Sequence, residues 1–269
     1  MNPLFFLKRM LGSRRSPRKP AEDKLRQGRS LSRNLNDNLA AVRTGLKNAS
    51  DLVIRELVFG GKPPRRIAVI YLRSMADLKV VAESVIGPLT SHAQARFAWM
   101  KRDGFLEHLR LRLPSARAVD LVDSMKSLVT GILEGRAVLL VDGISQALTI
   151  AVTNIPARAF QQPTSEVTVM GPQIGFTESI EDNVALVRTR LRSPDLAVER
   201  MVMGRKSRTE VRMLYLQGVA PDEIVSEMRR RLRLVDTDMI LDVGMIRDLL
   251  DERPYSPFIM ERLTERPVC

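Results

Sequence analysis

Residues 163–194, PTSEVTVMGPQIGFTESIEDNVALVRTRLRSP, predict a strand, a rigid turn and a helix in that order. Val167 and Val169 alternate with other side chains, as in a strand with one buried face. Gly171-Pro172 then stops the strand, because both residues favour turns and proline has no backbone N–H to donate. We expect the rest of the fold to be organised around this strand-to-helix corner.

The helix after the turn is predicted to be amphipathic and well capped. Thr177 is placed to accept from the first free amides, and Phe176 to pack under a turn formed with the help of Gly175. Acidic residues at the start of the helix and arginines at its end complement the helix dipole. We expect Arg188 and the two arginines after it to face outward. The predicted buried stripe comprises Ile180, Val184, Val187 and Leu191.

On physical grounds alone, a capped helix packed on a sheet is the favoured interpretation of this stretch. Its glycines suit a turn as well as they suit a phosphate cradle. Neither a Gly-x-x-x-x-Gly-Lys-Ser/Thr nor a Gly-x-Gly-x-x-Gly pattern accompanies them, so a nucleotide site has little support. We therefore predict no bound cofactor.

Composition restricts the chemistry further. The single cysteine, Cys269, cannot form an internal disulfide or a cysteine-based zinc site, which fits a reducing compartment. The two histidines, His92 and His108, stand sixteen residues apart without carboxylates at ligand spacing, so no metal is expected. No nucleophile and base, and no pair of carboxylates, stand in a supportive arrangement. We expect a protein that is not an enzyme.

Positive charge is concentrated at the amino terminus. The net charge is +12, and residues 1–33 carry ten Lys or Arg against Glu22 and Asp23. The remaining body is only weakly basic and the chain has few aromatic residues, so it lacks the usual signature of a nucleic-acid-binding surface. The apolar residues ahead of this basic run could rest on an anionic membrane surface, and a solvated tail is an equal alternative.

Several residues of the central stretch resemble the central motif of the GerA-type spore germinant receptor A subunits. The sequence departs from that family where Gln162, Met170 and Gln173 replace an acidic residue and two arginines. Pro163 and Thr177 match the motif, and eight further matching residues are candidates for a functional turn or interaction. These are Glu166, Gly171, Pro172, Gly175, Phe176, Glu178, Asn183 and Arg188.

Before this stretch, the apolar spacing predicts a helix over residues 31–48 and a strand over 52–57. Ser50-Asp51, between them, resembles a segment found early in the family. Residues 67–72 predict a strand covered on both faces. Further predictions are a helix over 74–85 ended by Gly87-Pro88, a helical stripe over 121–132, and a hairpin over 137–150 with a two-residue turn at Asp142-Gly143.

After the central helix, residues 198–204 and 208–216 predict two strands, with Val211, Met213 and Tyr215 on one face. Pro221 begins a helix that ends in an arginine cluster over 229–233, where a solvated face is favoured over an anion site. A short strand over 237–241 and a short helix over 245–250 complete the pattern.

The predicted fold class is α/β with mixed α+β sheets. A length of 269 residues with 44% hydrophobic content suits two small α/β subdomains in tandem, preceded by a basic tail and a helix. We place the tail at 1–30, the subdomains at 31–158 and 159–250, and a proline-containing segment at 251–269. No apolar run approaches the ~18–20 residues of a membrane-spanning helix, so none is expected.

The family resemblance implies a specific function, which composition alone does not indicate. It implies a non-catalytic receptor subunit at the cytoplasmic face of the spore inner membrane, with B and C subunits as partners and a small nutrient sensed indirectly. In the family this region leads into a membrane-spanning half. The alternatives are a basic nucleic-acid-binding module, a truncated or split subunit that binds its partners as a separate chain, and a truncated subunit that is no longer functional.

Overall fold

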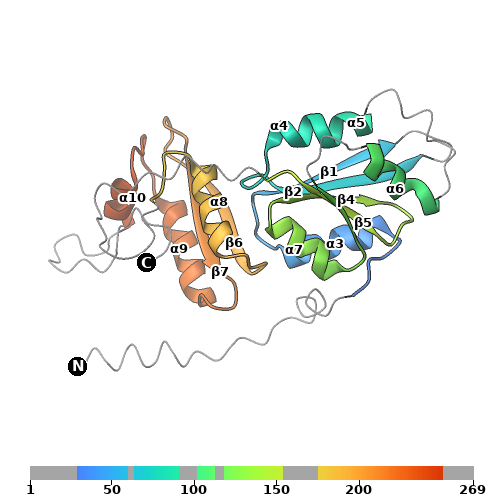
Figure 1. The fold of residues 1–269 in the computed structure, drawn as a ribbon. Helices are drawn as coiled ribbons and strands as arrows, with labels where there is room; N and C mark the ends of the chain where they lie inside the picture. Colours follow the sequence, from blue (N-terminus) through green and yellow to red (C-terminus); the bar gives the residue numbers. More distant parts are fainter. Residues whose placement is uncertain (1–28, 60–63, 91–101, 113–117, 154–174, 251–269) are drawn as a thin grey trace, which may run out of the picture.

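A five-stranded antiparallel sheet lies at the centre of the larger of two units in the computed structural model (Figure 1). The structure describes residues 29–59, 64–90, 102–112, 118–153 and 175–250. The strand order is β1-β2-β4-β5-β3, and every neighbouring pair is antiparallel. The strands are β1 (Leu52–Phe59), β2 (Arg65–Leu72), β3 (Val119–Val122), β4 (Arg136–Val141) and β5 (Ala147–Ala151).

Helices cover both faces of this sheet, giving three layers. One face carries α3 (Leu35–Gly45) and α7 (Met125–Leu133). The other carries α6 (Arg102–Arg112) and a continuous helix made of α4 (Leu78–Val80), the π-helical η1 (Val81–Ile86) and α5 (Gly87–Thr90). Because side chains alternate along a strand, Ala68, Ile70 and Leu72 face the first layer, whereas Ile67, Val69 and Tyr71 face the second.

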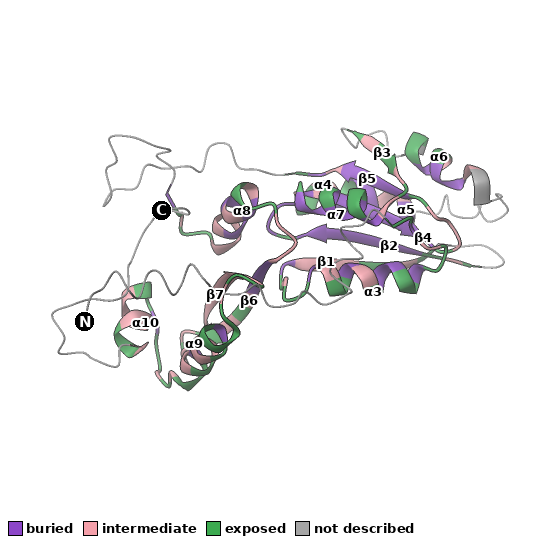
Figure 2. Cartoon of the chain, turned by 90° about the horizontal axis from the view of Figure 1, so that it is seen from below, coloured by how far each residue is buried: buried purple, intermediate pink, exposed green. Residues whose placement is uncertain are grey.

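The second sheet is a hairpin of β6 (Leu196–Met203) and β7 (Thr209–Leu216). Helix α8 (Ile180–Arg190) packs on one face through Val184 and Val187. Helices α9 (Asp222–Leu234) and α10 (Val243–Leu250) pack on the other. β7 is only half-buried along its length, in contrast with β4, which is buried from Ala137 to Val141 (Figure 2). The smaller unit therefore has the thinner core.

The predicted α/β class is confirmed, and so are most of the predicted elements. Leu31, Leu35, Leu39, Val42 and Leu46 are all buried, as the helical spacing before β1 required. β2 is covered on both faces as expected. The predicted strand at 167–169 lies outside the described residues, as do the tails at 1–28 and 251–269. The division between subdomains at 158/159 falls in the same gap and stays a prediction.

Four predictions about elements are wrong. Leu121 and Val122 lie in strand β3, not in a helix, and no strand forms over 237–241. The helix after β2 continues through Gly87-Pro88, because the preceding π-turn moves the Gly87 hydrogen bond to the carbonyl of Ala82. The connection after β4 is longer than two residues, since β5 begins only at Ala147, although Gly143 does adopt a positive φ of +85°.

Candidate functional site

The turn before α8 is held by a side chain of the helix itself. The backbone N–H of Thr177 donates to Asn183 Oδ1 at 2.7 Å, and Asn183 Nδ2 donates to the Thr177 carbonyl at 2.7 Å. The helix cap is Ser179, whose hydroxyl accepts from the Asp182 N–H at 3.3 Å. The prediction that Thr177 caps the helix is therefore wrong, because Thr177 lies two residues before the cap and its main chain is bound by Asn183.

The other predicted site residues near this turn do not form one cluster. Gly175 is buried and Glu178 is exposed. Phe176 is 38% exposed, so it does not pack under the turn as expected. Asn183 fixes the turn and faces Thr177. Glu166, Gly171 and Pro172 lie outside the described residues, and their proposed roles stay predictions.

Arg188 makes a buried ion pair with Asp51, 137 residues away in the sequence. Arg188 Nε donates to Asp51 Oδ2 at 2.7 Å and Nη2 donates to Oδ1 at 2.6 Å, and both side chains are only 1% exposed. The expectation that Arg188 faces outward is wrong, whereas Arg190 and Arg192 are exposed. This pair joins α8 of the smaller unit to the residue just before β1 of the larger one.

The Asp51 carboxylate accepts a third hydrogen bond. Ser74 Oγ donates to Asp51 Oδ2 at 2.7 Å, and the Asp51 carbonyl accepts from the Arg73 N–H at 2.8 Å. Charges removed from water are tolerated when they are paired with good geometry and further hydrogen bonds. The two-pronged contact also fixes the orientation of both groups, because a guanidinium fork matches a carboxylate in one plane.

The main chain joins the two units beside this pair. Val198 of β6 donates to the Asn48 carbonyl at 2.8 Å and accepts from the Ser50 N–H at 2.9 Å, so the α3–β1 connection runs parallel to β6 there. Gln217 Nε2 adds a bond of 2.6 Å to the Lys47 carbonyl. Asn48 adopts a positive φ of 60°, which turns the chain from α3 toward β6. We call residues 47–51, Arg188 and Val198 the joint.

A polar network extends the joint toward α9. Asn48 Nδ2 donates to Tyr215 Oη at 3.1 Å, and Tyr215 Oη donates to Glu199 Oε1 at 2.6 Å. Arg229 of α9 holds the same carboxylate with bonds of 2.8 and 2.6 Å. These Arg229 bonds lower the pKa of Glu199. Burial, followed by the bond to Glu199, raises the pKa of Tyr215.

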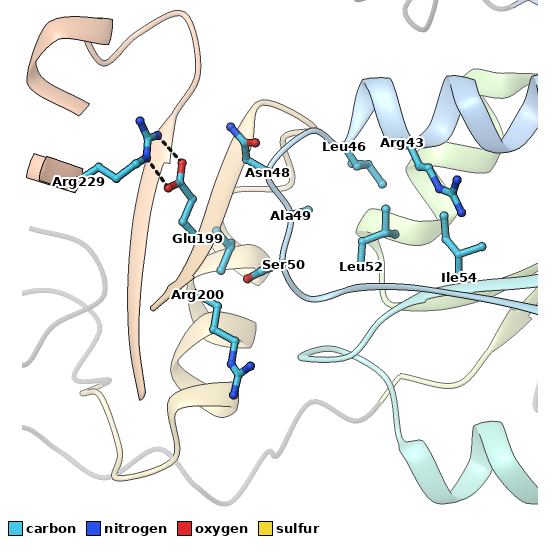
Figure 3. Close-up of a pocket in the computed structure, with 11 residues that line it drawn as sticks. Arg43, Leu46, Asn48, Ala49, Ser50, Leu52, Ile54, Glu199, Arg200 and Arg229 are labelled. Carbon is cyan, nitrogen blue, oxygen red and sulfur yellow. Dashed lines mark hydrogen bonds and ion pairs between the residues drawn. The ribbon is translucent and has the colours of Figure 1, made fainter. Parts of the chain in front are cut away.

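A hollow of about 690 Å³ opens between the joint and the network (Figure 3). Its lining comes from both units, with Leu46, Leu52 and Ile54 on one side and Glu199, Arg200 and Arg229 on the other. Within the described ranges, no group of three His, Cys, Asp or Glu residues could hold a metal ion. The lining combines apolar side chains with charged ones, of which Arg200 and Arg229 are ion-paired with Glu210 and Glu199.

Comparison with known proteins identifies the family. The model described as "Bacillus/Clostridium GerA spore germination protein" matches residues 40–268. The chain belongs to the GerA family. Spore germination protein KA of Bacillus subtilis (strain 168) is 30% identical over 237 residues, covering 88% of this chain and 43% of that protein. Spore germination protein GerLA of Bacillus cereus is 31% identical, with coverage of 88% and 47%.

A solved structure agrees with the GerA assignment. The N-terminal domain of the A subunit of the Bacillus megaterium spore germinant receptor GerK3 superposes with a TM-score of 0.67 at 29% identity, covering 90% of this chain and 87% of that domain. The expected resemblance to germinant receptor A subunits is confirmed. This GerA chain spans less than half the length of the curated relatives named above. No helix among its described residues is long and apolar enough to cross a membrane.

Sequence reasoning missed several residues of the joint and of the polar contacts beside it. Ser50-Asp51 was noted only as a family-like segment, and the roles of Ser74, Glu199 and Tyr215 were not foreseen. An acidic residue directly before an apolar strand was the one available signal for Asp51. Nothing in the local sequence pairs it with an arginine in another unit.

Proposed function

We propose that this chain is the non-catalytic, N-terminal part of a germinant receptor A subunit and couples nutrient sensing to the membrane part of the receptor. The relatives are spore germination proteins, and the superposed structure is the equivalent domain of such a subunit. None of the relatives named above is described as an enzyme. In this proposal the two units move relative to one another at the joint, and that movement biases the attached membrane part.

The observation that carries this proposal is the buried Asp51–Arg188 pair. A buried ion pair adds little stability compared with an apolar contact, but it favours one geometry strongly over others. Two discrete arrangements of packed units are the usual basis of coupling between sites. A pair that must be either made or broken gives the joint such a two-state character.

The proposed partners are the B and C subunits of the receptor, and the proposed location is the cytoplasmic face of the spore inner membrane. One curated relative, named uncharacterized membrane protein YfkQ of Bacillus subtilis (strain 168), is 30% identical over 90% of this chain. The basic amino-terminal segment would lie against anionic headgroups. A nutrient would act through the assembled receptor without needing to bind this chain.

Nucleic-acid binding has less support than it had from the sequence. Most of the arginine cluster of α9 is engaged in ion pairs: Arg229 with Glu199, and Arg230 and Arg231 with Glu227. The hydrogen bonds from Arg230 and Arg231 lower the pKa of Glu227 to about 2. Arginines that are already ion-paired attract phosphates less strongly. These arginines therefore mainly stabilise α9 and its contact with β6.

The test is germination of spores that carry Arg188→Lys in this gene and lack other receptors for the same nutrient. Lysine keeps the charge but cannot make the two-pronged contact. We expect slower nutrient-triggered loss of optical density at a normal level of the protein, measured by immunoblot. The matched control is Arg66→Lys, which alters an exposed pair with Glu56. Equal germination rates in the two variants would rule out coupling through the joint.

A further inference from the structure

The outer edge of β6, on the side away from β7, carries backbone groups to which no described residue is hydrogen-bonded. In an antiparallel ladder, the N–H and C=O groups of alternate residues point to the same edge. Val198 uses its groups to bond Asn48 and Ser50, so they point away from β7. The groups of Arg200 and Val202 must point the same way, and the described residues supply no hydrogen-bond partner for them there.

The chain itself shows that this edge accepts a strand. Ala49 bridges Val198 in parallel register, but the segment leaves the edge at Leu52, where β1 begins. The ladder that residues 48–50 start is therefore unfinished over Arg200–Met203. Figure 3 shows Ala49 and Ser50 beside the strand that carries Glu199 and Arg200, and Leu52 farther from it. Val202, farther along, is 48% exposed.

Two hollows provide the room that an added strand needs. The hollow of about 690 Å³ at the joint includes Val198 and Arg200, and a second, of about 480 Å³, runs along Glu199–Arg205 to the end of α9. Glu199 and Arg200 line both hollows, so the two lie next to one another on β6. Together they flank the unfinished part of the ladder on its open side.

The charge of this edge selects an acidic occupant. Five arginines line the two hollows against the acidic residues Glu199 and Asp236. Both carboxylates are engaged, Glu199 by Arg229 and Asp236 by Arg205. Arg43 and Arg233 are exposed, and neither makes an ion pair with any described residue. Carboxylates on an incoming segment would pair with these two guanidiniums.

We propose that the outer edge of β6 over Arg200–Met203 binds an extended acidic segment of a partner protein, which continues as an added strand the parallel register begun by residues 48–50. Main-chain hydrogen bonds to Arg200 and Val202 supply affinity, and alternate side chains enter the two hollows. Acidic side chains contact Arg43 and Arg233, and small apolar ones contact Val202. Because the strand contacts both units, its binding strengthens the joint.

Amide hydrogen exchange followed by NMR on the purified chain tests this proposal. The probe is the peptide acetyl-Val-Glu-Val-Glu-Val-Glu-amide. We expect the Arg200 and Val202 amides to exchange about tenfold more slowly at ninety per cent occupancy. The Met201 amide, which points toward β7, should change little. The same peptide with alternate N-methylated residues should give no protection, because it cannot donate to the edge.

A charge-reversal variant tests whether these two arginines select the acidic peptide, as distinct from general attraction to the basic chain. Arg43→Glu with Arg233→Glu should abolish protection by the acidic probe and permit protection by the corresponding Val-Lys peptide. Unchanged exchange of the Arg200 and Val202 amides at the highest concentration of the acidic peptide would overturn the proposal. So would slow exchange of both amides in the free chain, since that would mean another part of this chain already covers the edge. Equal protection by the N-methylated peptide would also contradict strand addition.

Discussion

Arg188 shows what the sequence can and cannot predict about a single residue. It is one of three arginines at the end of the same helix, and helix-dipole arguments treat all three alike. Two of them are exposed, whereas Arg188 is buried because Asp51 lies opposite it in the folded chain. The family motif marked Arg188 as a candidate, but only the tertiary structure gives its partner.

Loss of the Arg188 side chain should destabilise the fold strongly. Arg188→Met leaves the Asp51 carboxylate buried with only Ser74 as a side-chain partner, and such a change costs about 3–5 kcal/mol. Arg66→Met is the matched control, since its pair with Glu56 is 43% and 41% exposed and contributes at most about 1 kcal/mol. Urea unfolding measures both. Similar losses in the two variants would contradict a buried, orienting pair.

Glu199 should make stability depend on pH in the acidic range. Its hydrogen bonds from Arg229 lower its pKa below the reference value of 4.5, against an opposing effect of burial. A lowered folded-state pKa contributes stability that is present above the unfolded pKa and is lost as pH falls through the folded one. Urea midpoints between pH 3 and 7 should therefore fall less steeply with acid in Glu199→Gln than in the native chain. Glu178→Gln, which removes an exposed carboxylate, is the matched control, and an equal change in slope in both variants would contradict a role for the Glu199 contacts.

At the scale of elements, the hydrophobic pattern predicted those helices and strands whose residues follow a single clear pattern. The helix spacing ahead of β1, the unbroken apolar run of β2 and the alternation in β7 were interpreted correctly because each pattern is typical of one element. Leu121 and Val122 were assigned to a helix because four residues are too few to separate the two periods. The helix through Pro88 was missed because a π-turn has no simple sequence signal.

The start of α8 provides a test of capping. Asn183→Ala removes both 2.7 Å bonds to the Thr177 main chain and should cost about 1–3 kcal/mol. Ser179→Ala removes the cap and should cost about 0.5–2 kcal/mol. Thr177→Val keeps the main-chain bonds, so we expect the smallest loss of the three in urea unfolding. A larger loss for Thr177→Val than for Ser179→Ala would restore Thr177 as the cap.

At the scale of the whole molecule, the two sheets meet through a small set of specific contacts. The larger unit has a core on both faces of five strands, whereas the smaller one rests on a two-stranded hairpin. The described contacts between them centre on residues 47–51 with Arg188, Val198 and Gln217. The sequence predicted two units but not this joint, because its partners lie more than a hundred residues apart.

The most direct test of the joint is the distance between the two units in solution. Spin labels on Lys126→Cys of α7 and Glu223→Cys of α9, both exposed positions, in a Cys269→Ser background report that distance by pulsed electron resonance. We predict one narrow distance distribution in the native chain and a broad or two-peaked one when Arg188→Met is added. A narrow, unchanged distribution in the Arg188→Met chain would contradict the central role of the Asp51–Arg188 pair.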